Sequence, residues 1–356
     1  MRPLTIQRDI LLALSGLLLA VGLILLASAS NVVGFERFGD SYFYLKHQVF
    51  FGVVPGIIFF VIAKQLPLNF WRRMAPWLYA ASLVLLVVTL LPGIKGIGPT
   101  KSWIVVGSIS FQPGELAKFT LILMLAWWAQ HRRDVGSFLF ILLPIVVLLV
   151  LQPDIGTLSV LVGIALAMYF LAGGSLVSMG VLVLAAVAVL AAVVVAAPYR
   201  LNRLLVFWNA AYDPQGAGYQ LHQALIAIGS GGLWGRGLAH SIQKFQYLPE
   251  VQSDSLFAVI AEELGFVLTM ALLIAIAVFW RTLLKLALSI EDRFSKVAIG
   301  GILTWFSFQT FLNLGAMLGL LPLTGVPLPL LSYGGTALVS ELVALGFVLG
   351  VTRARN

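Results

Sequence analysis

The chain of 356 residues contains no cysteine and only four histidines. Without cysteine it can form no disulfide, no thiolate metal site and no thiol nucleophile. The histidines are His47, His131, His222 and His240. No two of them are four residues apart, the helical spacing that places two imidazoles on one metal, so we expect no zinc centre.

Charged residues are also scarce. They make up 10% of the chain and hydrophobic residues 60%, whereas soluble domains carry roughly 25% charged residues. The mean hydropathy is +1.02. Apolar runs of about 20 residues recur along the chain, and this length spans a membrane as a helix. The composition predicts an all-α, polytopic integral membrane protein.

About ten transmembrane helices are expected from the apolar runs. Their predicted ranges are 10–29, 47–64, 75–92, 114–130, 137–151, 155–172, 176–198, 256–281, 295–320 and 335–352. An even number places both termini on one side, and most of the 22 Lys and Arg residues fall in segments on that side. The positive-inside rule makes it the cytoplasm. The net charge of +8 is therefore a topology signal, and no nucleic-acid partner is expected.

The segments expected outside are longer and richer in turn residues than those inside. They are 93–113, the turn Gln152-Pro153-Asp154, the loop 199–255 between helices seven and eight, and 321–335. Long loops are often functional, so we expect a single membrane domain over 1–356 whose site faces away from the cytoplasm and from ATP. The first apolar run is too long for a cleaved signal and is expected to remain as an anchor.

The glycine-rich run 229–237 lies within this long loop. It lacks the spacing and the Lys-Ser/Thr ending of a nucleotide-binding loop. We interpret it as backbone that turns tightly, and we expect no nucleotide cofactor.

Two turns place an acid at the start of a helix. Gln112-Pro113-Gly114-Glu115 opens the fourth helix, and Gln152-Pro153-Asp154 opens the sixth. Helix capping explains Asp154 as well as a functional role does. Lys118 follows Glu115 by three residues, which places an ammonium beside the carboxylate. Charged pairs at membrane depth usually face a cavity lined by protein.

Polar groups are expected deeper in the bundle as well. Glu262 and Glu263 lie about two turns into the eighth helix and Glu341 about two turns into the tenth, which predicts a polar, wet interior. The segment 321–335 is apolar but contains three prolines, so it is irregular and must be buried or line a cavity. Transporters hold substrates on such broken segments, so the fold alone leaves an enzyme and a transporter open.

The end of the long loop is acidic, with Glu250 and Asp254 in the run Tyr247-Leu248-Pro249-Glu250-Val251-Gln252-Ser253-Asp254. The whole chain has only 14 Asp and Glu residues. An acid held at a membrane boundary is costly. We therefore expect the chemistry at this loop.

Several motifs occur in the order found in one known family. They are Ser102-Trp103-Ile104, 112–118, 152–157, Gly218-Tyr219-Gln220, 227–232, 248–254, 257–265 and 328–335. By these motifs the chain resembles the SEDS family, which contains RodA, FtsW and SpoVE, from its first helix to its last. It departs from the family at Gly114, at Gln252-Ser253 and at Thr336. The short termini resemble RodA and the run Ser241-Ile242-Gln243-Lys244 resembles FtsW, so the subfamily stays open with a lean toward FtsW.

The resemblance implies a peptidoglycan glycosyltransferase that polymerises lipid II on the outer face of the bacterial cytoplasmic membrane during cell elongation or division. It implies a class B penicillin-binding protein, a single-span transpeptidase, as partner, among other elongasome or divisome membrane proteins. A flippase for lipid-linked precursors and a pure scaffold are the alternatives. A polymerase makes polymer without nucleotide, a flippase only moves substrate between leaflets, and a scaffold does neither.

Asp254 is the candidate catalytic residue for this chemistry. It can act as general base or as a ligand of Mg²⁺ or Mn²⁺, or it can merely cap the eighth helix. Lys118, Arg203, Arg236 and Lys244 are candidates to meet the diphosphate, with a headgroup-binding charge as the alternative. The candidate substrate-binding set also includes Glu115, Asp154, Glu250 and Ser332. On the ninth helix, the small residues Gly300 and Gly301 are expected to face the partner's helix.

Overall fold

The computed structural model describes residues 2–92, 94, 101–107, 109–131, 134–195, 198–209, 216–245 and 247–353. Lys95, Arg132, Arg133 and Arg355, four of the basic residues behind the positive-inside argument, lie outside these ranges. Helices dominate the described chain. They are α1 (Arg2–Phe38), α2 (Phe43–Gln48), the π-helical turn η1 (Val49–Val53), α3 (Val54–Gln65), α4 (Leu68–Val88), α5 (Pro113–His131), α6 (Val135–Leu151), α7 (Ile155–Leu171), α8 (Leu176–Val195), α9 (Pro198–Trp208), α10 (Ala217–Ser230), α11 (Leu256–Ser289), α12 (Arg293–Met317) and α13 (Gly335–Arg353).

Each of the ten predicted helices is present. The second is made of three consecutive segments, α2, η1 and α3, because a π-helical turn interrupts it. Within the described ranges, six helices are both long and apolar enough to cross a membrane, and α6 and α7 are equally apolar but have 17 residues. The remaining two, α4 and α5, carry more polar side chains. The all-α membrane architecture is thereby confirmed.

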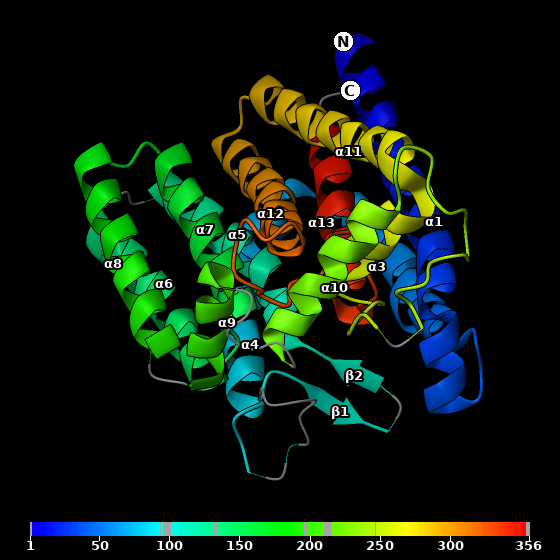
Figure 1. Ribbon diagram of the computed structural model, residues 1–356. Coiled ribbons are helices and arrows are strands. Elements are labelled where there is room, and N and C mark those ends of the chain that lie inside the picture. Colours follow the sequence, from blue (N-terminus) through cyan, green and yellow to red (C-terminus); the bar gives the residue numbers. More distant parts are fainter. Residues whose placement is uncertain are drawn as a thin grey trace.

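Four elements, two helices and two strands, were not predicted. The loop 199–255 contains the helices α9 and α10, and the segment 93–113 contains a hairpin of β1 (Ile104–Val106) and β2 (Ile109–Phe111). The two strands are antiparallel, with Val105 opposite Ser110. The hairpin lies at the end of the bundle opposite to the start of α1 and the end of α13 (Figure 1). We call these two ends the hairpin end and the terminal end.

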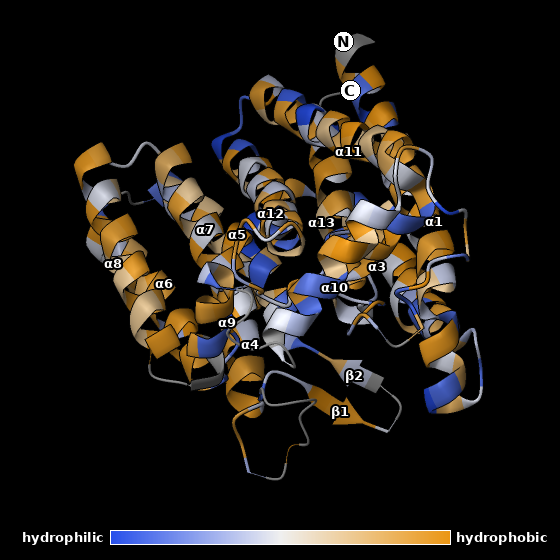
Figure 2. Cartoon of the chain, viewed as in Figure 1, coloured by the Kyte–Doolittle hydropathy of each residue, from blue (hydrophilic) through white to orange (hydrophobic). Residues whose placement is uncertain are grey.

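The helices pack in a defined order. α13 runs along α3, α4 along α5, and α11 along both α1 and α12. Hydrophobic residues make up most of the length of the helices (Figure 2), and many are exposed, such as Leu184 on α8 with 72% exposure. Such large apolar surfaces suit a lipid environment and are unfavourable in water.

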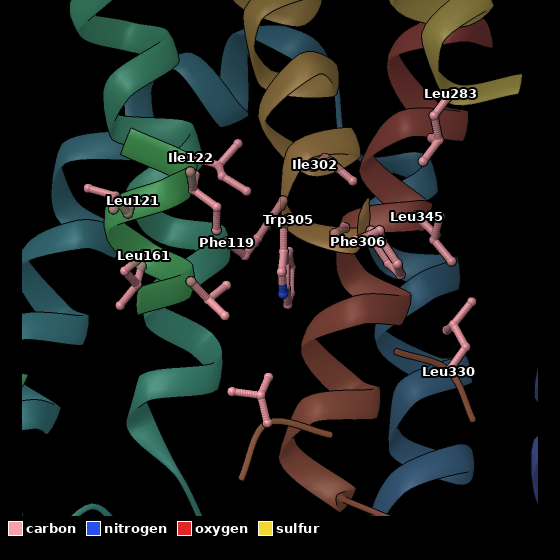
Figure 3. Packing of buried hydrophobic residues seen from close by; sticks show 14 of the residues in the cluster. Phe119, Leu121, Ile122, Leu161, Leu283, Ile302, Trp305, Phe306, Leu330 and Leu345 are labelled. Atoms are coloured by element: carbon pink, nitrogen blue, oxygen red, sulfur yellow. The ribbon is translucent and has the colours of Figure 1, made fainter. Parts of the chain in front are cut away.

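The core lies where α5, α7, α12 and α13 meet. Trp305 and Phe306 of α12 are buried against Phe119 of α5 and Leu345 of α13 (Figure 3). Gly300 and Gly301 also belong to this core, since a Cβ on Gly300 would lie 2.6 Å from Leu171 and one on Gly301 2.7 Å from Met168. The prediction that these glycines face a partner helix is wrong: their small size lets α12 approach α7.

α11 is broken at Gly265, which has φ 70° and ψ −177°. The glycine-rich run fills the break. The N–H groups of Phe266 and Val267 donate to the carbonyls of Gly232 and Leu233, while those of Arg236 and Gly237 donate to the carbonyls of Glu262 and Glu263. A Cβ on Gly235 would lie 2.2 Å from the main-chain carbonyl oxygen of Glu263, so this close approach requires glycine. The interpretation of this run as structural backbone is confirmed.

Candidate active site

Asp254 lies in the turn before α11, and its carboxylate is buried with 7% exposure. The N-cap position of α11 belongs to Ser255, not to Asp254. The Asp254 carboxylate instead accepts from Gln220 Nε2 of α10 at 3.4 Å and from Ser253 Oγ at 3.5 Å. Helix capping therefore does not explain this residue.

Arg203 of α9 lies beside Asp254. A Cβ added to Gly325 would be 3.9 Å from both Arg203 Nη1 and Asp254 Oδ2, so the two opposite charges share one small region. Arg203 Nη1 also donates to the Leu323 carbonyl at 3.1 Å. Thus α9, the start of α11 and the loop 318–334 meet here. We call this loop, between α12 and α13, the apolar loop.

Burial sets the protonation of Asp254. Burial and the neighbouring Glu250 charge together raise the pKa of that carboxyl to about 6, although the Arg203 charge opposes the rise. A carboxyl in this range is a better proton acceptor at neutral pH than an exposed aspartate.

Glu250 lies on the exposed side of the same turn. Its Oε2 atom accepts from Gln252 Nε2 at 2.9 Å and from Ser253 Oγ at 3.2 Å. Ser253 therefore contacts both Glu250 and Asp254. Glu250 has a φ of 52°, which is rare for a residue with a side chain.

Lys118 and Glu115 form the predicted pair in the interior. Lys118 Nζ lies 2.7 Å from Glu115 Oε1, and both side chains are buried. Lys118 Nζ also donates to Gln309 Oε1 at 2.8 Å and lies 5.6 Å from the Trp305 ring centre. No hydrogen-bond partner is seen for Glu115 Oε2 among the described residues. The contact with Gln309 of α12 joins this pair to another element.

Two further candidates hold the apolar loop. Glu341 of α13 accepts from the Leu330 N–H at 2.8 Å, and Leu330 has a φ of 62°. The Ser332 hydroxyl accepts from the Leu328 N–H at 3.0 Å. These contacts make both side chains parts of the loop's scaffold.

Asp154 caps α7. Its Oδ1 atom accepts from the Thr157 N–H at 3.0 Å, and its Oδ2 atom accepts from Thr157 Oγ1 and from Gln112 Nε2, both at 3.0 Å. The capping alternative for Asp154 is confirmed. The contact from Gln112 also joins the turn before α5 to the turn before α7, the two turns that share a Gln-Pro pattern in the sequence.

Arg236 and Lys244 lie away from Asp254, next to the break in α11. Arg236 Nε lies 3.4 Å from Glu262 Oε1, and Lys244 Nζ lies 3.4 Å from Glu263 Oε1. Ser28 of α1 donates to both oxygens of Glu263. Glu262 and Glu263 are polar groups of the interior, as predicted, and groups of the loop and of α1 bond to both carboxylates.

Lys244 is only 1% exposed, so it is not a headgroup-binding charge either. Its ammonium donates to the Ala239 carbonyl at 2.6 Å as well as meeting Glu263. Arg236 is partly exposed. Both basic residues therefore fasten the loop to α11 and leave Arg203 as the basic group nearest Asp254.

Two amide side chains near Asp254 were given no role in the sequence analysis, although Gln220 lies in one of the family motifs. Gln220 of α10 bonds to Asp254 and to Ser255 Oγ, the latter at 3.0 Å. Asn313 of α12 donates to the main-chain carbonyls of Asp254 and Val326, both at 2.8 Å. For Asn313, a neutral amide within an apolar helix was the available signal.

A metal site would have few protein ligands. No cluster of three His, Cys, Asp or Glu residues occurs in the part of the chain that the structure describes. Asp254 and Glu250, linked by the Ser253 hydroxyl, are nevertheless oxygen donors of the kind that Mg²⁺ accepts together with water and phosphate oxygens. The residues present thus fit a weakly held Mg²⁺ or Mn²⁺ and do not fit zinc.

The fold and these contacts define a polytopic membrane protein with a buried acidic site between its broken helix, its long loop and its apolar loop. The family model of FtsW, RodA and SpoVE, described as cell cycle protein, matches residues 8–356. The chain belongs to this family, and the resemblance to SEDS proteins is confirmed.

Relatives match over almost the whole chain. The probable peptidoglycan glycosyltransferase FtsW of Thioalkalivibrio sp. is 42% identical, covering 96% of this chain and 88% of that protein. Stage V sporulation protein E of Bacillus subtilis is 37% identical, covering 97% and 96%.

Two solved structures confirm the fold. A chain from a study of the structural coordination of polymerization and crosslinking by a peptidoglycan synthase complex matches with a TM-score of 0.79 and 30% identity, covering 97% of each chain. The rod shape determining protein RodA of Thermus thermophilus matches with a TM-score of 0.73 and 29% identity, covering 97% of this chain and 96% of that one.

Proposed function

We propose that the protein is a peptidoglycan glycosyltransferase that polymerises lipid II, with Asp254 as its catalytic residue. The observation that carries the proposal is the buried Asp254 carboxylate beside the Arg203 guanidinium, since both contact the space at Gly325. Several relatives bear the name probable peptidoglycan glycosyltransferase FtsW. Such a protein serves cell division or elongation.

The two charges suit the two ends of the reaction. Chain extension forms a bond between the 4-hydroxyl oxygen of the acceptor sugar and the anomeric carbon of the donor, and it breaks the bond from that carbon to the lipid diphosphate. The hydroxyl proton passes to the Asp254 carboxylate. Arg203 stabilises the negative charge that develops on the departing diphosphate.

A bound cation is the second way in which Asp254 can act. Asp254 and Glu250 would hold Mg²⁺ or Mn²⁺, and the ion would neutralise diphosphate charge. Chelation with EDTA separates the two roles. A strong loss of polymerisation that added Mg²⁺ restores supports a ligand role, whereas activity unchanged by EDTA supports a general base.

The alternative function is a flippase for lipid-linked precursors. Purified protein incubated with labelled lipid II in detergent, without nucleotide, should convert it to polymer. In detergent there is no second leaflet, so a flippase leaves the label as monomer. Absence of polymer, with transfer of label between leaflets of reconstituted vesicles, would replace the polymerase with the flippase.

We infer that the hairpin end faces outside the cytoplasmic membrane and that both termini lie in the cytoplasm. The chain has no native cysteine, so single cysteines report orientation without background. Val106→Cys at the hairpin and Glu291→Cys between α11 and α12 are both at exposed positions. A reagent that does not cross membranes should label Val106→Cys in intact cells and Glu291→Cys only after lysis. The reverse pattern would invert the orientation.

We infer that a class B penicillin-binding protein packs its single membrane helix on α11. Phe266, Met270, Ile274 and Val278 are exposed apolar side chains spaced four residues apart, so they form one stripe. A related chain was solved within a peptidoglycan synthase complex.

Ile274→Trp should weaken co-purification with this transpeptidase several-fold, because the larger ring separates the helices. Leu184→Trp on the equally exposed α8 is the matched control and should leave co-purification at the parental level. If both variants retain the partner equally, the interface lies elsewhere.

Polymerisation should depend on pH through Asp254. The proposed role needs the carboxylate, and the pKa of Asp254 is raised to about 6. Lowering the pH through about 6 therefore protonates Asp254 and should reduce the rate, with little change as pH rises from 7 to 8. The rate of lipid II consumption, measured between about pH 4.5 and 8, should show this fall on the acid side of the pH profile, which we call the acid limb. An acid limb near pH 4 would mean that an exposed carboxyl limits the reaction.

A further inference from the structure

Two buried amides of α12 bind neighbouring carbonyls of the apolar loop. Gln309 Nε2 donates to the Pro327 carbonyl at 2.9 Å, and Asn313 Nδ2 donates to the Val326 carbonyl at 2.8 Å. The two residues lie four apart, on the same face of the helix. Gln309 is 0% and Asn313 1% exposed.

Each amide also contacts one of the charged residues. Gln309 Oε1 accepts from Lys118 Nζ and from Trp305 Nε1, both at 2.8 Å. Asn313 Nδ2 gives its second contact to the main-chain carbonyl of Asp254 at 2.8 Å. The Lys118 ammonium is thus joined to the Asp254 backbone through the two amides of α12 and the consecutive residues Val326 and Pro327 of the apolar loop.

The chemistry of this contact specifies the side chain at position 313. Both neighbours are carbonyl oxygens, which can only accept, so the side chain must offer two donors from one atom. An amide nitrogen does so without charge. No partner is seen for Asn313 Oδ1 among the described residues, so the residue retains a costly buried oxygen in order to present its NH₂ group.

The apolar loop also bonds directly to the turn that carries Asp254, because the Tyr333 N–H donates to the Gln252 carbonyl at 2.9 Å. Its prolines lack N–H groups, and the side-chain hydrogen bonds to the Asp254 carboxylate are long, at 3.4 and 3.5 Å. The Asn313 amide is the shortest side-chain hydrogen bond to Asp254 in the described chain. It acts on the backbone that carries the carboxylate.

We propose that Asn313 is a positioning residue for Asp254, which its amide holds in register with the apolar loop, and that Gln309 extends this hold to the Lys118–Glu115 pair. The inference rests on the catalytic role proposed for Asp254. Asn313 has no contact with the reacting atoms in this role. It fixes the distance between the Asp254 carboxylate and the Gly325 region.

The test uses two variants that remove the donors in different ways. Asn313→Asp keeps the shape and replaces the NH₂ group by oxygen, and Asn313→Leu keeps a similar volume without charge. Thr310→Val is the matched control, because Thr310 is a buried residue of the same helix whose hydroxyl bonds only within α12, to the Phe306 carbonyl. Purified full-length proteins are compared for kcat and KM with lipid II, for the pH profile and for thermal unfolding in detergent.

We expect kcat to fall about 10- to 100-fold in both Asn313 variants, the effect typical of a reacting group displaced by about 1 Å. KM should stay within about threefold, since substrate contacts remain. The acid limb should move below pH 6, because a released Asp254 gains water while Arg203, Glu250 and Gln220 still face it. Thr310→Val should keep the parental kcat and the parental limb.

A folded Asn313 variant with parental kcat and an unmoved acid limb would overturn the proposal. The proposal would also be overturned if an Asn313 variant lost as much thermal stability as Thr310→Val and kept its kcat, since Asn313 would then have only a structural role. If one variant does not fold, the other decides. Asp254→Asn is measured alongside: activity of that variant refutes the role of Asp254 itself, whereas an inactive Asp254→Asn with an unaffected Asn313→Leu refutes only the positioning role.

Discussion

Replacing Asp254 by asparagine should abolish polymerisation of lipid II while the protein still folds. The substitution keeps the size of the side chain, and its amide can still meet Gln220 and Ser253. It removes the negative charge that would accept the hydroxyl proton or hold a cation. Loss of a general base typically costs about 10²- to 10⁴-fold in rate. Polymer length and yield from labelled lipid II, measured on purified protein, provide the readout.

Asp134→Asn is the matched control. Asp134 is an aspartate that caps a helix, accepting from the Ser137 N–H at 2.8 Å, and asparagine caps equally well. It should polymerise at the parental rate. If Asp254→Asn also polymerises at that rate, the catalytic assignment must move to Glu115, Asp154 or Glu250.

Much of the fold could be predicted because its signals are local. A run of about 20 apolar residues identifies a membrane helix from sequence alone, and all ten predicted helices are present. The Lys118–Glu115 pair follows from the same logic, since residues three apart on a helix are neighbours. The resemblance to a family then directed attention to Asp254.

What the sequence could not predict depends on contacts between distant segments. Lys244 pairs with Glu263 because the glycine-rich run crosses the break at Gly265. No residue near Lys244 in the sequence indicates this ion pair. Charge alone suggested a lysine that meets the diphosphate or, as the alternative, a lipid headgroup. The amides Gln220 and Asn313 were missed for the same reason, since their carbonyl and carboxylate partners come from other elements.

The helices of the long loop were missed for a different reason. α9 begins at Pro198, and α10 follows the sequence 209–216, which contains Asn, Asp, Pro, Gln and Gly; such residues favour a loop prediction. Both helices are amphipathic, and the period of their apolar residues was the signal available. The omission matters, because α9 brings Arg203 and α10 brings Gln220 to Asp254.

Replacing Lys118 by methionine should remove both activity and stability. The substitution deletes the ammonium that lies 2.7 Å from Glu115 and leaves a buried carboxylate without a partner, which typically costs roughly 3 to 5 kcal/mol. It also frees Gln309, whose other end holds the Pro327 carbonyl of the apolar loop. Thermal unfolding in detergent and the lipid II assay measure the two effects separately.

A double variant decides whether the activity is lost through instability or through the site. Combining Lys118→Met with Glu115→Gln removes the unpaired charge and should recover most of the stability, because a neutral amide is far cheaper to bury than a carboxylate. Activity should stay low, since the contact from Lys118 to Gln309 and the apolar loop is still missing. Recovery of polymerisation together with stability would limit the pair to a structural role. Full activity of Lys118→Met alone would show that the bundle needs no charge at this position.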